Sequence, residues 1–224
     1  MQSEQFFASD RPGLVSAGRG VEGESFRIID AEMEGHAFPA DQWQITRRVI
    51  HTTGDFDYAN WIRFHPEAVA SAVSALRAGC TIFTDTRMVQ VGLSPWRLSW
   101  FGNRVETPAA DPESQVWAEQ LGVTRSVAAF RHSAPRFDGA ILAVGNAPTA
   151  LLETLRAVKE DGVVPACVIG VPVGFVQAAE SKELLYRETD LASITVLGRK
   201  GGSSVAVAIL HALLELAKNG EKKG

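Results

Sequence analysis

The sequence predicts an α/β fold built around a mainly parallel β-sheet, and three observations support this. Short apolar runs recur along the chain, most regularly in its second half. Each run ends in a glycine-bearing turn, and a helical pattern follows the turn. Repeats of strand, turn and helix are typical of right-handed βα units, whose strands are parallel. The 224 residues, 46% of them apolar, are enough for one large domain with a substantial core.

The first elements are predicted to be helical. Residues 1–20 are polar and rich in glycine, and we interpret them as a surface arm. Residues 23–32 carry apolar side chains near helical spacing, and Ser25 is a candidate N-cap. Pro39 interrupts the chain before a second helix, which Gly54 ends.

The middle of the chain contains one well-defined helix and one strand. Pro66–Ala78 begins with proline, is rich in alanine and stops before Gly79. Thr81–Thr84 follows as a short buried strand. Residues 94–112 contain three prolines, so we expect them to be irregular or to form a hairpin.

The second half has the most regular pattern. The strands expected there are Ala140–Val144, Ala166–Ile169 and Ile194–Leu197. The helix after the strand Ala140–Val144 has one apolar face, formed by Leu151, Leu152, Leu155 and Val158. Two later helices are expected at Phe175–Arg187 and Val205–Leu216. Val205–Leu216 is apolar on every side, which predicts that it is largely buried.

These elements predict an open three-layer α/β/α sandwich of flavodoxin-like type with a mainly parallel, five-stranded sheet, because the units are too few for an eightfold barrel. We expect a single α/β domain over residues 21–219 and a C-terminal tail over residues 220–224. Ligands bind such sheets outside the carboxyl ends of the strands. The residues expected there are Asp85, Asn146, Pro172, Arg199 and Lys200.

Composition excludes several classes of protein. A formal net charge of −4 argues against nucleic acid as a partner, because sequence-independent binding needs a basic surface. Cys80 and Cys167 are far apart, which argues against a disulfide framework or a metal site and favours a reducing cytoplasm. No apolar run is long enough to span a membrane, and the N-terminus lacks the order of a signal peptide.

The strongest local candidate for chemistry is the stretch Arg47–Asp55, which holds two guanidiniums, an imidazole, two hydroxyls and a carboxylate. His51 can exchange a proton near neutral pH without a large pKa shift. Arg48 precedes it by three residues, so on a helix both side chains project from one face. A proton donor beside a fixed cation suits an anionic substrate that needs one proton.

The other candidates are more ambiguous. The turn Gly198–Ser204 resembles an anion-binding turn at a helix N-terminus, but it fits neither nucleotide-binding glycine spacing. A carboxylate site and a tight turn with two solvated cations therefore both stay open. His211 lies in the apolar final helix and is more typical of a core residue, and the remaining histidines, His36, His65 and His132, are typical of surface positions. By local pattern alone Arg125 is a surface arginine and Asn146 a helix cap.

A series of short motifs extends over about residues 20–217. In the first half they are Ser25-Phe26, Arg48 with His51, Gly54-Asp55, Asp85 with Met88-Val89, and Thr124–Ser126. In the second half they are Gly145–Leu151, Val168–Val176, Ala178–Glu183 and Gly198–Ser203. Together, in this order, they resemble the precorrin-8X methylmutase family of cobalamin biosynthesis.

The resemblance implies a homodimer of flavodoxin-like subunits with active sites near the subunit interface, acting on a tetrapyrrole without a cofactor. Neighbouring enzymes of the corrin pathway are further candidate partners. The implied reaction is an isomerisation that moves a methyl group from C-11 to C-12 of precorrin-8X or cobalt-precorrin-8, giving hydrogenobyrinic or cobyrinic acid. The family's histidine falls on His51, its arginines on Arg48 and Arg125, and its early serine on Ser25.

From this we expect His51 to be the general acid that protonates the macrocycle and lowers the barrier to methyl migration. Arg48, Arg125, Arg199 and Lys200 are expected to hold the substrate carboxylates.

Thr53, Asp85 and Asn146 complete the expected substrate-binding set. Thr52-Thr53 stands where the family commonly has Ala-Cys, which changes the hydrogen-bonding groups near the imidazole. A non-catalytic tetrapyrrole carrier is the alternative function. A nucleotide-dependent enzyme is a third interpretation, which lacks a phosphate-binding motif.

Overall fold

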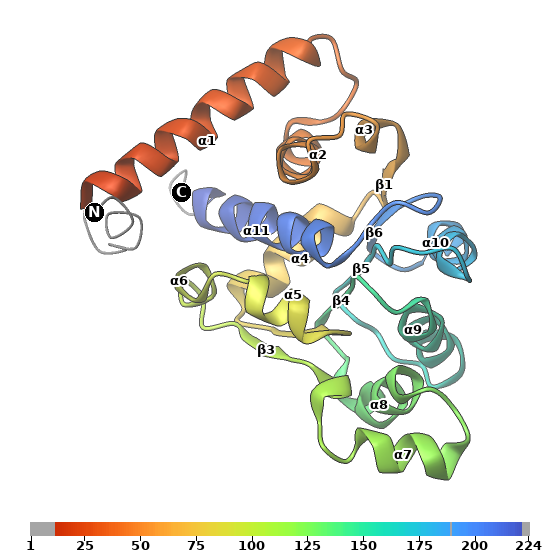
Figure 1. Cartoon of the computed structure of the whole chain (residues 1–224). Coiled ribbons are helices and arrows are strands. Elements are labelled where there is room, and N and C mark those ends of the chain that lie inside the picture. The colour runs from red at the N-terminus through yellow and green to blue at the C-terminus, as the bar shows by residue number, and fades with distance from the viewer. Residues whose placement is uncertain (1–11, 189, 221–224) are drawn as a thin grey trace, which may run out of the picture. The chain divides into compact units, whose positions relative to one another are not determined.

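The structure is a computed structural model that describes residues 12–188 and 190–220 (Figure 1). It divides into two compact units, which meet in sequence between Phe38 and Pro39. The described residues of the first unit, 12–38, contain one helix, α1 (Pro12–Glu32). Residues 12–20 of the predicted arm are therefore helical, and residues 1–11 lie outside the described part. Ser25 lies well inside α1, so the prediction that it caps the helix is wrong.

The second unit is a mixed α/β structure, as predicted, and it contains a six-stranded sheet. The strands are β1 (Ile62–Phe64), β2 (Thr81–Thr84), β3 (Arg104–Glu106), β4 (Ile141–Val144), β5 (Cys167–Gly170) and β6 (Ser193–Val196). They lie in the order β1-β6-β5-β4-β2-β3, and all neighbours are parallel except β1 and β6.

The prediction of five strands is wrong by one, because the sheet also has an antiparallel edge strand, β1. β3 corrects a second expectation, since it pairs in parallel with β2 inside the region expected to be irregular or a hairpin. Each of these edge strands has only three residues. Such a length is too short for an alternating pattern to be visible in the sequence.

The helices of the second unit cover both faces of this sheet (Figure 1). On one side are α2 (Ala40–Thr53), α4 (Ala68–Arg77), α5 (Arg87–Gly92) and α11 (Ser203–Gly220). On the other are α8 (Arg125–Ser133), α9 (Pro148–Glu160) and α10 (Ala178–Arg187). The unit also contains three short helices, α3 (Tyr58–Trp61), α6 (Pro95–Leu98) and α7 (Ser114–Leu121). Two 3-10 helical turns lie at Pro108–Ala110 and Ala134–Arg136.

Burial explains why the central strands read as continuous apolar runs. Every residue of β4, β5 and β6 is buried, as expected for parallel strands covered on both faces. On the face of α8, α9 and α10, Phe83 contacts Phe137 edge-to-face with ring centroids 4.9 Å apart. The prediction that the final helix is largely buried is confirmed by α11. Across the described residues, no helix is both long and apolar enough to cross a membrane.

Candidate active site

The carboxyl ends of the parallel strands bring together several of the predicted polar residues. Asp85 follows β2, Asn146 follows β4, and the turn Gly198–Ser203 follows β6. The turns after β4 and β6 are in direct contact, because a Cβ atom on Gly145 would lie only 2.8 Å from Ser203 Cα. Glycine at position 145 is therefore a requirement of this close approach.

Asp85 organises the turn after β4 with its carboxylate. Its side chain is 4% exposed and accepts backbone N–H bonds from Gly145 at 3.0 Å, Asn146 at 2.8 Å and Ala147 at 2.6 Å. Burial raises the pKa of Asp85, and the three N–H donors oppose this by stabilising the carboxylate. These donors lie in the turn just before Pro148, the first residue of α9, so Asp85 fixes the turn that leads into this helix.

This arrangement differs from the expectation for Asn146. Asn146 was expected to cap the following helix, but the cap position is Ala147, which makes no side-chain cap bond. The side chain of Asn146 is exposed instead, and it lines a cavity of about 430 Å³ together with Asp85, Thr86 and Arg125. A larger cavity of about 830 Å³ adjoins this one and shares Arg87 and Thr107 with it.

Arg125 is the first residue of α8, and its side chain is exposed at the 430 Å³ cavity. The helix begins there because the Thr124 hydroxyl accepts the N–H of Val127 at 3.4 Å. Arg125 therefore lies opposite the end of β4, where an anionic group in the cavity could reach it.

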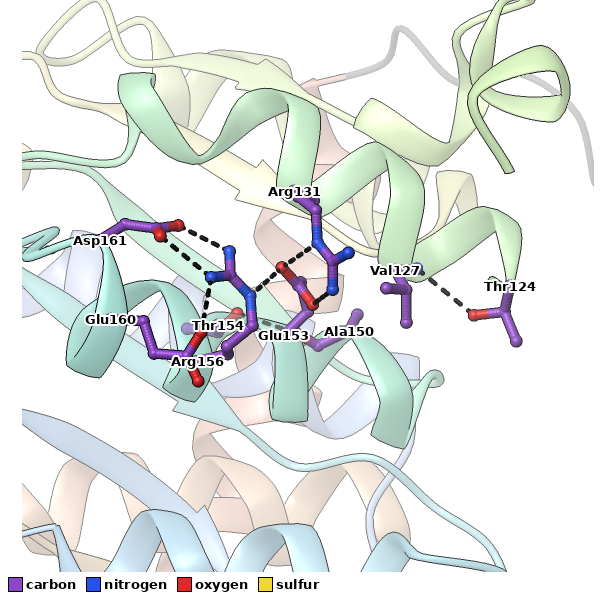
Figure 2. Close-up of polar contacts among 9 residues, drawn as sticks. All are labelled: Thr124, Val127, Arg131, Ala150, Glu153, Thr154, Arg156, Glu160 and Asp161. Atoms are coloured by element: carbon purple, nitrogen blue, oxygen red, sulfur yellow. Dashed lines mark hydrogen bonds and ion pairs between the residues drawn. The ribbon is translucent and has the colours of Figure 1, made fainter. Parts of the chain in front are cut away.

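An ion-pair network around the buried Glu153 fixes α8 against α9 (Figure 2). The 4% exposed side chain of Glu153 accepts two bonds from Arg131 of α8, both of 2.9 Å, and one of 2.6 Å from Arg156. Arg156 in turn donates to Glu160 and Asp161 at the end of α9. The network holds the helix that begins with Arg125.

His51 lies in the last turn of α2. The helix ends where predicted, because Gly54 adopts a left-handed conformation (φ 64°) and donates its N–H to Ile50 O at 2.8 Å. Ile45, Val49 and Ile50 are fully or almost fully buried, whereas His51 is partly exposed. The apolar neighbours thus anchor the helix and leave the imidazole at its accessible side.

Arg48 has a partner that the sequence analysis did not identify. Its side chain is 9% exposed and donates to Glu215 of α11 at 2.6 Å, and Arg97 binds the other oxygen of Glu215 at 2.8 Å. Two cations around one carboxylate leave the cluster with net positive charge. Arg48 also lines a cavity of about 290 Å³, together with Thr52, Met88 and His211.

The turn Gly198–Ser203 presents its two cations in different ways. Lys200 Nζ is bound by Asp55 at 2.5 Å and Asp57 at 3.1 Å, and these carboxylates raise its pKa. Arg199 is exposed and lies over the ring of Phe175, 5.3 Å from the centroid, while Phe175 is itself 84% exposed. The turn therefore presents one paired ammonium and one guanidinium stacked on an accessible aromatic ring.

The remaining predicted residues have simpler environments. The Thr53 hydroxyl donates to Val49 O at 2.8 Å within its own helix. Ser25 lies on α1, in the first unit. His211 Nε2 accepts the Ser94 N–H at 3.0 Å, as expected of a satisfied histidine, but the residue is partly exposed and so is not in the core. His132 stacks on Trp117 with centroids 3.8 Å apart.

Two residues of the site region were missed, and both had a detectable signal. Lys182 shares the buried face of α10 with Ala178, Ser181 and Leu185, so a lysine occupies a core position of an amphipathic helix. Glu215 is the one acidic residue among the apolar side chains of the Val205–Leu216 run. A charge at such a position requires a partner.

Metal and thiol chemistry have little support in the residues that the structure describes. No group of three or more histidine, cysteine, aspartate or glutamate side chains in residues 12–188 and 190–220 is arranged to hold a metal ion. Burial raises the pKa of Cys80 to about 11 and that of Cys167 to about 12, so both thiols stay protonated near neutral pH.

Fold and site thus define an α/β protein with histidine, arginine and turn-bound cations near the carboxyl edge of a parallel sheet. A family model described as precorrin-8X methylmutase matches residues 20–216. The chain belongs to this family of isomerases of cobalamin biosynthesis, as the motifs predicted.

Individual relatives agree with this assignment over nearly their whole length. The chain is 42% identical to a cobalt-precorrin-8 methylmutase of Leptospira interrogans, covering 93% of this chain and 99% of the relative. It is 39% identical to a precorrin-8X methylmutase of Pseudomonas aeruginosa, covering 89% and 96%. A solved precorrin-8X methyl mutase from Thermus thermophilus is 45% identical, with a TM-score of 0.83 over 90% of this chain and 97% of that one.

Proposed function

We propose that this protein moves a methyl group from C-11 to C-12 of precorrin-8X or cobalt-precorrin-8. The observation that carries the proposal is the family match over residues 20–216, together with relatives of both names at about 40% identity. The products are hydrogenobyrinic acid or, for the cobalt-containing substrate, cobyrinic acid. The reaction is an isomerisation, so atoms and electrons balance without a co-substrate.

We propose that His51 is the general acid. Methyl migration on a conjugated macrocycle becomes easier when a proton on a pyrrolic nitrogen or adjacent carbon makes the ring electron-poor. Such catalysis typically contributes about 10²–10⁴-fold in rate. The partly exposed position of His51 on a helix anchored by buried neighbours supports this role, because the imidazole is both accessible and held in place.

The substrate is a polyanion, and we propose that Arg125, Asn146 and Arg199 bind its carboxylates. Arg125 and Asn146 support this assignment by lining the same 430 Å³ cavity. Arg199 is exposed, and the accessible Phe175 ring beneath it offers an apolar surface beside a cation. Guanidinium groups suit carboxylates because they can bind both oxygens.

We propose that the other predicted residues contribute less directly to substrate binding. They are Arg48, Lys200, Asp85, Thr53 and Ser25. Arg48 and Lys200 already bind protein carboxylates, so each contributes positive potential unless the substrate displaces its partner. Asp85 shapes the turn that presents Asn146. We propose that Thr53 and Ser25 contribute hydroxyl groups, with the family's early serine falling on Ser25.

We further propose a flavodoxin-like topology, supported by the strand order β3-β2-β4-β5-β6 of the five parallel strands, which corresponds to 2-1-3-4-5. We also propose a homodimer in the cytoplasm, with residues 21–219 acting as one methylmutase domain and corrin-pathway enzymes as neighbours. The family match over residues 20–216 supports this domain assignment.

Replacement of His51 tests the mechanism. In the His51→Ala variant, the absorption change of isomerisation should slow by about 10² or more, while the pigment still binds. The Arg125→Ala variant is the matched contrast and should mainly weaken binding of the tetrapyrrole. Undiminished turnover in His51→Ala would remove the imidazole from the mechanism. Absence of turnover in the wild-type protein, with binding intact, would instead favour a carrier.

A further inference from the structure

We propose that Lys182 is a positioning residue for substrate binding: its buried ammonium holds the turn that carries Arg199 and joins that turn to the helix of His51. The inference rests on the proposed function of the turn Gly198–Ser203. Lys182 lies on α10, outside the residues expected to touch the substrate.

The first step is the contact between Lys182 and the turn. The side chain is fully buried, and its Nζ donates to the backbone carbonyl of Lys200 at 2.6 Å. In a trans peptide the C=O and the following N–H point in opposite directions. By holding the Lys200 carbonyl inward, the ammonium therefore directs the N–H of Gly201 away from itself.

The second step is the fit of the turn around this contact. Gly201 lies so close to the end of β5 that a Cβ atom on it would be 2.2 Å from Val171 O. The same oxygen accepts the Gly202 N–H at 2.8 Å. The backbone after Lys200 is thus fixed by Val171 on one side and by Lys182 on another.

The third step links the turn to the proposed acid. The ammonium of Lys200 binds Asp55 at 2.5 Å and Asp57 at 3.1 Å. Asp55 is four residues beyond His51, directly after the Gly54 cap of α2. Lys182, Lys200 and Asp55 therefore form a continuous chain of contacts from α10 through the turn to the end of the histidine helix.

A buried ammonium group is rarely found in a contact that only stabilises the fold, because burying its charge costs free energy. Burial lowers the pKa of Lys182 to about 8, which means that the protein environment disfavours its charge. An apolar side chain of similar length would fill the same space without this penalty. What it would lose is the donor to Lys200 O, and with it the orientation of the turn.

The experiment compares Lys182→Met with a control at a second lysine, Lys159→Met. Lys159 is on α9 and makes a single 2.8 Å ion pair with Glu188, away from the turn. We expect Lys182→Met to raise KM for the corrinoid substrate about tenfold, with kcat changed much less, because a charge-assisted hydrogen bond that orients the binding turn is lost. Lys159→Met should leave both constants unchanged.

A double-mutant cycle separates positioning from general structural damage. Asp55→Ala breaks the other end of the same chain of contacts, so its effect on KM should not add to that of Lys182→Met. Fully additive effects would overturn the inference, and so would an unchanged KM in Lys182→Met. If Met at position 182 prevents folding, the combined Asp55→Ala and Asp57→Ala variant decides, because it releases Lys200 from both carboxylates and an unchanged KM there also overturns the inference. Absence of turnover in the wild-type protein would overturn the proposed function itself.

Discussion

Asp85 is an acidic residue at the carboxyl edge of a sheet, a position that usually indicates a ligand-binding role. Its oxygens are instead occupied by three backbone N–H groups of the turn after β4. The sequence could place Asp85 at this edge because it follows a clear strand. It could not show the three donors, which lie about 60 positions further along the chain.

The same limit applies to Arg48. Its place beside His51 follows from helical spacing, but Glu215 is 167 positions away in the sequence. Local pattern therefore selects candidate residues, and only the tertiary structure shows which of them already have a partner. For Arg199, which is exposed, the predicted role needs no such revision.

Asp85→Asn tests the role of this carboxylate in holding the turn after β4. The amide keeps one oxygen acceptor but turns an NH₂ group toward a backbone N–H, which leaves a buried donor unsatisfied. We expect the free energy of unfolding to fall by about 1–3 kcal/mol, measured by urea denaturation.

The control is Asp138→Asn. Asp138 is exposed and accepts one backbone N–H, from Val164 at 2.7 Å. Its replacement should cost less than about 1 kcal/mol. Equal losses in the two variants would contradict a special role for Asp85.

Among the elements, the buried strands and long helices were predictable and the short edge elements were not. β2, β4, β5 and β6 are apolar runs that end in turns, and α4 lies between Pro66 and Gly79, two residues inside the predicted start. β1 and β3 each add three residues whose pairing depends on a neighbour already in place. α1 extends further toward the N-terminus than expected, because glycines at positions 13, 18 and 20 suggested an arm.

The pairing of α8 with α9 gives a prediction for a whole element. Glu153→Ala would leave Arg131 without its carboxylate partner, while Arg156 keeps Glu160 and Asp161 (Figure 2). We expect unfolding to become easier by about 1–3 kcal/mol, because the charge-assisted hydrogen bonds that join α8 to α9 are lost, while the partly exposed Arg131 can turn to water. The measurement is thermal unfolding followed by circular dichroism.

Glu160→Ala is the matched control for this network. The Glu160 carboxylate is 67% exposed and shares Arg156 with Asp161. Exposed ion pairs of this kind contribute about 0–1 kcal/mol. A loss in Glu160→Ala as large as that in Glu153→Ala would show that burial of Glu153 does not determine its contribution.

For the molecule as a whole, Lys182 makes stability depend on pH. The pKa of its amine is lowered by burial from 10.5 to about 8. Between these values the unfolded chain holds a proton that the folded chain does not, so the free energy of unfolding rises with pH. The full difference corresponds to roughly 3 kcal/mol.

Urea denaturation from pH 7 to pH 10.5 checks this expectation. The difference in free energy of unfolding between wild type and Lys182→Met should grow in favour of wild type as pH rises through 8. Other titrating groups, such as Tyr58, contribute to both proteins and cancel in the difference. A difference that stays constant with pH would mean that Lys182 titrates like an ordinary lysine.

The contact of Gly145 with Ser203 has a consequence for any effort to change the specificity of this enzyme. A side chain on residue 145 would collide with the backbone of Ser203, so library members that replace Gly145 are expected to distort both turns or fail to fold. Substitutions that change specificity without preventing folding are therefore expected at Arg125 and Arg199, because both side chains are exposed. Selection for a new pigment should therefore enrich changes at these arginines and preserve the glycine.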